Sequence, residues 1–276
     1  MATRTPWVAG KFYPKNRYDL ADIIKNFQKA EKDKINYKLP VVSIIGGIVP
    51  HAGYEFSGYE AIHFFELLRK SGQKFDTVII LTPNHTGYGA DISLDTNEFW
   101  ETPLGKVPLD LEFQERMGFE LRSDAHKNEH SAEVIIPFLQ QTLNFSFNIV
   151  PVVMLDQSVS AARRIAASLF EVSMYQNKKI LVIASSDFSH FVSPEEGLRQ
   201  DDLAVDQILQ FNSDELAAVV KNKRISICGC GPIMALLEYS LISSMNPKIE
   251  LLKRGNSSKR YPSVEVVDYV SFIIFE

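Results

Sequence analysis

Short apolar stretches alternate along this chain with longer stretches in which apolar residues recur at helical spacing. Three of the apolar stretches, residues 42–49, 75–82 and 179–184, have the length and composition of buried strands. Buried strands that alternate with amphipathic helices are typical of α/β proteins. The alternation therefore predicts a three-layer α/β sandwich, with a central, largely parallel sheet and helices on both of its faces.

The expected helices place apolar residues three and four positions apart among charged ones. They cover residues 16–33, 57–70, 131–139, 158–175, 194–211, 213–221 and 231–243. Ser57, with Glu60 three residues later, is predicted to cap the second of these helices, and Gly72 to end it. Ser131 is predicted to cap the third.

Four further stretches have strand character: residues 91–94, 148–155, 249–254 and 264–275. The long alternating stretch at 264–275 predicts added antiparallel strands, so the sheet should be mixed. The sequence contains no internal repeat, no long charge run and no tract rich in proline, glycine and serine. A single domain over residues 1–276 is therefore expected.

Charge and motif content argue against several classes of function. The formal net charge is −5 and the basic residues are scattered, so a dedicated nucleic-acid binder is not expected. No apolar run reaches the roughly 20 residues that span a bilayer, and the first six residues lack the apolar region of a secretory signal, so we expect a cytoplasmic protein without membrane association. Phosphate-binding loops, G-x-G-x-x-G and G-x-S-x-G motifs are also missing from the sequence.

Each of the three apolar stretches is followed by a residue that can bind a metal or a proton. His51 follows residues 42–49, His85 follows residues 75–82, and Asp187 follows residues 179–184. Strand ends meet at one rim of an α/β sheet, where such proteins build their sites. Two imidazoles and one anionic ligand would hold a metal while leaving coordination positions open for substrate or oxygen.

The residues leave two alternatives for the anionic ligand, Asp187 and Cys228. Cys228 precedes a Gly-Pro pair that can open the helix at 231–243, and a helix N-terminus favours the thiolate over the thiol. The other cysteine, Cys230, stands too near in sequence for a structural disulfide with it. A small buried hydrophobe is the ordinary role of a lone cysteine.

Two more histidines stand beside these strand ends. His130 lies just ahead of an expected helix, and His190 lies three residues after Asp187. Either imidazole could move protons for a reaction at the metal, or could simply cap a helix or bind backbone. His63, within a helix, and His126, in a polar loop, are predicted to be structural or solvated.

Six short blocks, in this order, resemble those of the Memo (mediator of cell motility) family. They are A-G-K-F-Y-P at 9–14, V-P-H-A-G-Y at 49–54, P-N-H at 83–85, E-H-S-A-E at 129–133, S-S-D-F-S-H at 185–190 and I-C-G at 227–229. Each block alone is weak, but their order over most of the chain is specific.

The resemblance implies a fold similar to that of the class III extradiol dioxygenases, which are non-haem iron enzymes. It further implies that His51, His85 and Cys228 bind the metal, and that His130, Asp187 and His190 lie in the pocket as candidate catalytic residues. Fe(II) is the expected metal, with copper and zinc as alternatives. The expected function is a redox enzyme that acts on a small molecule.

Two other functions remain open at this point: a non-catalytic metal- or peptide-binding module, and a zinc-dependent hydrolase. Prokaryotic relatives are described as protein B of the AmmeMemoRadiSam system, which implies an AMMECR-type domain and a radical SAM protein as partners. The sequence departs from the animal pattern, with Cys230 and Gly231 in place of Arg-His and Thr86 in place of a second histidine. The signalling roles of animal members are therefore not expected here.

Overall fold

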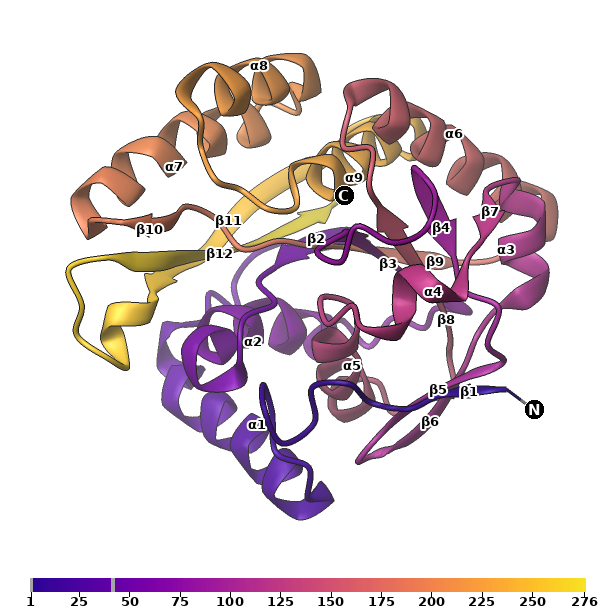
Figure 1. Ribbon diagram of the computed structural model, residues 1–276, viewed down its shortest axis with the longest axis horizontal. Coiled ribbons are helices and arrows are strands. Elements are labelled where there is room, and N and C mark those ends of the chain that lie inside the picture. Colours follow the sequence, from indigo (N-terminus) through magenta and orange to yellow (C-terminus); the bar gives the residue numbers. More distant parts are fainter. Residues whose placement is uncertain (1, 41–42) are drawn as a thin grey trace.

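The computed structural model describes residues 2–40 and 43–276 (Figure 1). Its helices are α1 (Arg17–Glu31), α2 (Tyr54–Ser71), α3 (Leu111–Met117), α4 (Ser123–Lys127), α5 (Ile136–Thr142), α6 (Val159–Gln176), α7 (Pro194–Leu209), α8 (Ser213–Lys223) and α9 (Cys230–Ser243). Short 3₁₀ turns cover Lys32–Lys34, Glu133–Ile135 and Ser257–Lys259. The expected long helices therefore form, with ends shifted by a few residues.

The strands that make the main sheet are β2 (Ile44–Val49), β3 (Thr77–Pro83), β4 (Ile92–Leu94), β7 (Glu120–Leu121), β8 (Asn148–Met154), β9 (Ile180–Ser185), β10 (His190–Val192), β11 (Lys248–Asn256) and β12 (Val266–Phe275). Their order is β10-β12-β2-β9-β3-β8-β4-β7, and β11 also pairs with β12. The central strands β2, β9, β3 and β8 are parallel, whereas β12 pairs antiparallel with β2, β10 and β11. The predicted mixed sheet is confirmed. Val42, where the first strand was expected to begin, lies outside the described residues.

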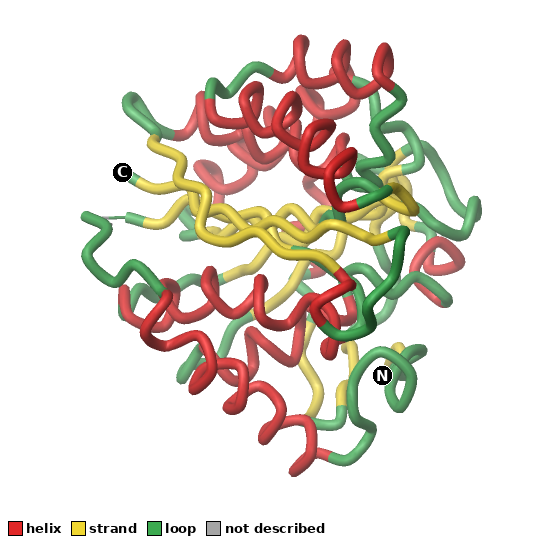
Figure 2. The backbone as a smooth tube through the Cα atoms, turned by 90° about the vertical axis from the view of Figure 1, so that its left-hand side faces the viewer, coloured by secondary structure: helices red, strands yellow, loops and turns green. Residues whose placement is uncertain are grey.

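Helices cover both faces of this sheet, as Figure 2 shows. Side chains alternate along each central strand, so that Ile79 and Leu81 of β3 pack with α6 and α9, while Val78 and Ile80 pack with α2 and α5 on the other face. Burial on both faces explains why the strands are continuous apolar runs. Each fully buried Ile or Leu contributes roughly 1.5–3 kcal/mol relative to an exposed one.

Two predicted helix caps are wrong. Helix α2 begins at Tyr54, with Gly53 at the cap, so Ser57 lies inside the first turn and donates to the Ala52 carbonyl. Tyr54 fixes the earlier start, because its hydroxyl donates to the Val134 carbonyl in the core. The other end of α2 is as predicted, since Gly72 adopts the left-handed conformation at φ 64°.

Ser131 does not cap a helix either. Its backbone N–H and its hydroxyl both donate to Glu129, and a 3₁₀ turn precedes α5. The expected helix is therefore shorter and starts later than the sequence indicated.

A small second sheet was not predicted. It consists of β1 (Thr3–Arg4), β5 (Phe99–Thr102) and β6 (Gly105–Pro108), in the order β1-β5-β6. Strands of two to four residues carry too little periodic signal to be read from a sequence. None of the helices in the described part of the chain combines the length and apolar character needed to cross a bilayer.

Candidate metal centre

The strand ends bring the predicted site residues together. Pairing of β2 with β9 places Val49 opposite Ser185, and pairing of β3 with β9 places Leu81 opposite Ala184. The parallel strands therefore end nearly level, and His51, His85 and Asp187 follow them at one rim of the sheet.

Three of these side chains, His51, His85 and Cys228, form a group that could hold a metal ion. One donor atom from each lies within 4.8 Å of the other two. The Cys228 Sγ is 3.2 Å from the His51 Nε2, and the ring centroids of His51 and His85 are 5.2 Å apart. Of the two alternatives for the third donor, the structure places Cys228 in this group and Asp187 beside it.

The hydrogen bonds of His51 determine which ring nitrogen carries the proton. The Ser185 hydroxyl has one hydrogen, which it donates to the Ser131 carbonyl at 2.8 Å. Ser185 must then accept from His51 Nδ1, also at 2.8 Å. This assigns the proton to Nδ1 and leaves the Nε2 lone pair facing Cys228. Burial and the charges of His130 and His85 lower the pKa of His51 well below its usual range, so the imidazole is neutral and ready to bind a metal.

His85 is held in the same way by a carboxylate. Its Nδ1 donates to Glu129 Oε1 at 3.0 Å, which leaves Nε2 free. Burial opposes protonation of His85, but the hydrogen bond and the charge of Glu129 outweigh it and raise the pKa of the imidazole. A carboxylate that accepts from a ligand histidine orients the ring and increases its basicity.

Glu129 is the functional residue that the sequence reasoning missed, although it stands in the E-H-S block beside His130. Its buried Oε1 accepts from His85, from the backbone N–H of His130 and from both Ser131 donors, and Oε2 accepts from the His85 backbone. Burial disfavours the charge, yet these donors and the His85 charge keep the pKa of Glu129 below its usual range. His85, Glu129 and His130 also lie within 4.8 Å of one another. Because Oε1 already accepts four hydrogen bonds, we interpret Glu129 as an orienting group for the imidazoles.

Cys228 differs from the prediction in its protonation. Burial, followed by the Asp187 charge, raises the pKa of its thiol. The expectation that a helix N-terminus favours the thiolate is therefore wrong for the metal-free protein, because α9 begins two residues later and desolvation dominates. Gly229 lets this loop approach closely, since a Cβ there would lie 2.5 Å from the Ser185 carbonyl oxygen.

The Asp187 carboxylate holds the loop after β2 in place, next to the three candidate metal-donor atoms. Its Oδ1 accepts from the backbone N–H groups of His51 (2.8 Å) and Ala52 (3.3 Å), and its Oδ2 lies 3.9 Å from His51 Nε2. The Asp187 backbone N–H donates to Cys228 Sγ at 3.3 Å. Burial raises the pKa of Asp187 to about 6, which makes it a group that can gain or lose a proton near neutral pH.

A cavity of about 460 Å³ opens over this group. Its lining includes His51, His85, His130, Asp187, His190, Lys11, Phe12, Phe56 and Tyr269. His130 and His190 are thus both brought to the site, as expected, and the aromatic rings and Lys11 are additions that sequence reasoning did not assign.

The two flanking histidines differ in their surroundings. Burial lowers the pKa of His130 to about 4, with the His85 charge adding to the effect and Glu129 opposing it. His190 Nδ1 lies 2.8 Å from the Ser226 carbonyl, so this nitrogen donates and Nε2 carries the lone pair. His63 and His126 lie apart from the cavity lining and are buried, bonded to Glu31 and to the Ser93 carbonyl. The structural interpretation of those two histidines is confirmed.

Known proteins are similar to this chain over most of its length. A family model described as Memo-like protein matches residues 4–273. A MEMO1 family protein of Desulfurococcus amylolyticus is 38% identical over 267 residues, which cover 93% of each chain. Another, of Methanococcoides burtonii, is 35% identical over 275 residues, or 98% of this chain and 99% of the relative. A crystal structure of an uncharacterized protein from Escherichia coli K12 covers 84% of this chain and 100% of its own, at 11% identity and a TM-score of 0.47.

The family match runs over residues 4–273 and so includes all six blocks, and these two relatives cover 93% and 98% of the chain. The chain therefore belongs to the Memo-like protein family.

Proposed function

We propose that this protein is a redox enzyme with a single metal ion bound by His51, His85 and Cys228. The observation that carries the proposal is the hydrogen-bond pattern behind the two imidazoles. Ser185 and Glu129 fix the Nδ1 proton of His51 and His85 respectively, so that both rings offer Nε2 toward the same space. A purely structural histidine pair has no need of this matched orientation.

The donor set favours a soft or borderline metal. Imidazole nitrogen suits iron, copper and zinc, and a cysteine sulfur shifts the preference further from calcium and magnesium. We propose Fe(II) as the resident metal, with copper and zinc as alternatives. When bound, Fe(II) or copper would supply one-electron chemistry and open coordination positions at the floor of the cavity.

Three neighbouring groups are proposed to handle protons. His190 offers a lone pair at Nε2, and His130, whose pKa is about 4, is neutral near pH 7 and can accept a proton. Asp187, whose pKa is about 6, is mainly ionised at pH 7 and can hold a water or a substrate hydroxyl next to His51. The aromatic residues Phe12, Phe56 and Tyr269 line the same cavity and are proposed to give an apolar wall for the substrate.

Elemental analysis of anaerobically purified protein tests the ligand set. Wild type is expected to hold about one metal ion per chain, and His51→Ala, His85→Ala and Cys228→Ala to lose it. Cys230→Ala is the matched control, because Cys230 is a second, buried cysteine two residues from Cys228. Metal content that is unchanged in all three ligand variants contradicts the assignment.

Turnover then separates the three functions. Metal-dependent oxidation of members of a catechol panel, lost in His51→Ala, supports the redox enzyme. Bound metal without turnover favours a non-catalytic binding module, and stoichiometric zinc with ester or phosphoester hydrolysis favours a hydrolase.

The proposed partners are an AMMECR-type domain and a radical SAM protein, from the resemblance to prokaryotic family members. Their association is checked by co-purification of the tagged chain with each separately expressed partner. Failure to retain either protein contradicts this part of the proposal and leaves the metal assignment intact.

A further inference from the structure

Two buried carboxyl groups lie side by side behind the loop that carries Asp187 and His190. Asp201 belongs to α7 and Asp268 to β12, and their exposed fractions are 2% and 6%. Each carboxyl group is close enough to affect the pKa of the other. The elements involved, α7, β10, β11 and β12, lie together on the left in Figure 1. We refer to Asp201 and Asp268 as the carboxyl pair.

Asp201 and Asp268 hold residues 187–190 from two sides, Asp201 through its carboxyl group and Asp268 through its backbone. Asp201 Oδ1 accepts from the Ser189 hydroxyl at 2.6 Å and from the Ser189 backbone N–H at 3.2 Å. The Asp268 backbone accepts from the N–H of Phe188 and donates to the carbonyl of Ser189, both at 2.9 Å. The two residues at the centre of the segment are therefore fastened to helix α7 and to strand β12 at once.

Asn256 is hydrogen-bonded to the Asp268 carboxyl group, but one oxygen of that group has no donor in the described part of the chain. Asp268 Oδ2 is fully buried and has no hydrogen-bond partner among the described residues. It sits against the backbone of α7, since a Cβ at Gly197 would lie 1.9 Å from it. Two ionised carboxylates in such a place repel each other and leave acceptors unsatisfied. One proton turns a carboxylate into a donor and removes both costs.

The surrounding charges do not neutralise the pair fully. Arg254 of β11 faces it, but its Nη1 is bonded to Asp202 at 2.5 Å and its Nε has no partner among the described residues. Glu195 of α7 lines the same hollow and adds negative charge, while Tyr269 and Asn256 are neutral. Burial is the main cause that raises the pKa of Asp201 to about 7 and that of Asp268 to about 6.

We propose that the carboxyl pair shares one proton and, in that form, clamps residues 187–190, which positions Asp187 and His190 at the metal centre. The role in positioning Asp187 and His190 at a metal centre rests on the proposed function. The hydrogen-bonded clamp on residues 187–190 does not depend on it. Asp201 and Asp268 are positioning residues, since their contacts to the cavity pass through the segment between them.

Amide hydrogen exchange of the full-length protein without added metal tests the clamp. The amides of Phe188 and Ser189 are followed from pH 5 to pH 8 and corrected for intrinsic exchange. Opening releases the proton, because an exposed aspartate has a pKa of about 3.9. The opening constant should therefore rise roughly tenfold per pH unit from pH 5 to about 6 and level off above about 7.

Asp201→Asn supplies a permanent donor, so its opening constant should rise less steeply than that of wild type, by roughly tenfold per pH unit between pH 5 and about 6. Any slope that comes from Asp187, whose pKa is about 6, is common to both proteins and cancels in this comparison. Asp206→Asn, an exposed aspartate on the same helix α7, is the matched control and should keep the wild-type slope, because it leaves the Arg254–Asp202 pair intact. A flat wild-type profile, or an unchanged slope in Asp201→Asn, overturns the proposal. If Asp201→Asn does not fold, Asp268→Asn and carboxyl ¹³C titration of wild type decide the matter, since two carboxyls that both ionise near pH 4 contradict proton sharing.

The outcome is separable from the proposed function. A flat exchange profile in a wild-type protein that binds metal contradicts the clamp alone. An intact slope in a protein that binds no metal contradicts the metal centre alone.

Discussion

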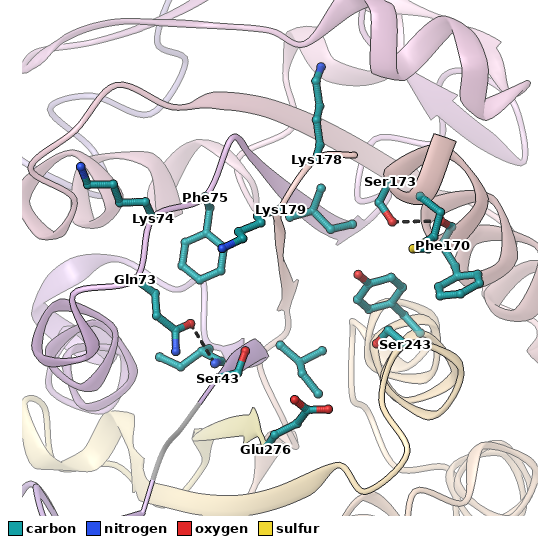
Figure 3. Close-up of a pocket in the computed structure, with 15 residues that line it drawn as sticks. Ser43, Gln73, Lys74, Phe75, Phe170, Ser173, Lys178, Lys179, Ser243 and Glu276 are labelled. Carbon is teal, nitrogen blue, oxygen red and sulfur yellow. Dashed lines mark hydrogen bonds between the residues drawn. The ribbon is translucent and has the colours of Figure 1, made fainter. Parts of the chain in front are cut away.

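The two ends of the same parallel strands carry hollows of similar size and opposite character. At the amino end, a cavity of about 510 Å³ is lined by Lys74, Lys178, Lys179, Gln73 and Glu276, among others (Figure 3). At the carboxyl end, the cavity of about 460 Å³ is lined by four histidines and Asp187. Cavity volume alone does not distinguish them.

The two ends differ in what their polar side chains do. At the amino end, Lys178 is bonded to Asp110 at 2.7 Å and Gln73 accepts from the Ile44 backbone, so these side chains stabilise the fold. At the carboxyl end, His51 and His85 are buried or half-buried, and each uses Nδ1 for a hydrogen bond and turns Nε2 to a shared space. Perturbed groups that are held in place without a structural task of their own make the carboxyl end the candidate functional end.

The largest expected effect is loss of metal binding from the carboxyl end. Cys228→Ala or His51→Ala should weaken Fe(II) or Zn(II) binding by more than about 100-fold, because one of three donors is removed. Competition with a chromophoric chelator measures the change. A metal affinity within threefold of wild type in either variant would contradict the assignment of metal binding to the carboxyl end.

A pH dependence of similar size is expected at the carboxyl end. Burial raises the pKa of the Cys228 thiol, so metal binding must displace its proton, and affinity should increase with pH. One displaced proton gives roughly tenfold per pH unit, or about 100-fold from pH 6 to pH 8. The same chelator competition at pH 6, 7 and 8 checks this. A pH-independent affinity would mean that the thiol is not a ligand.

A smaller effect is expected for the carboxylate beneath the imidazoles. Glu129→Gln keeps the shape but removes the charge that orients His85, so metal affinity should fall about 10- to 100-fold. Glu133→Gln is a poor comparison because Glu133 pairs with Arg4. Glu112→Gln, an exposed glutamate on α3, is the better control and should leave metal affinity unchanged. Equal metal affinities of Glu129→Gln and Glu112→Gln would contradict the orienting role of Glu129.

The smallest effect on metal binding is expected at the amino end. Lys178→Met leaves Asp110 buried without its cationic partner, which should lower the free energy of unfolding by about 1–3 kcal/mol. Metal affinity should stay within about twofold of wild type. Urea denaturation and chelator competition on the same samples measure both quantities, and a metal-binding defect in the folded variant would show that the two ends are coupled.

Much of the fold was predictable because its signals are local. The central strands are continuous apolar runs, and the long helices carry one apolar face, so β2, β3, β8, β9, α1 and α6 could be placed from sequence. The helix starts at Tyr54 and Ile136 could not, because the long-range bond from Tyr54 to Val134 and the local bond from Ser131 to Glu129 replace the expected caps. The short strands β1, β5 and β6 depend on pairing with one another.

The sequence by itself determined which residue types stand after which strands, and so named His51, His85, Asp187 and Cys228 as candidates. The residue pattern alone left Asp187 and Cys228 open as the third donor, and the family resemblance implied Cys228. The tertiary structure places Cys228 in the three-donor group, because residue 228 reaches the rim through a loop whose path no local pattern encodes. It also decided the protonation of each group. Burial, the hydrogen bonds that the imidazoles donate to Ser185 and Glu129, and neighbouring charges act through space, and they set ring orientation and pKa independently of sequence separation.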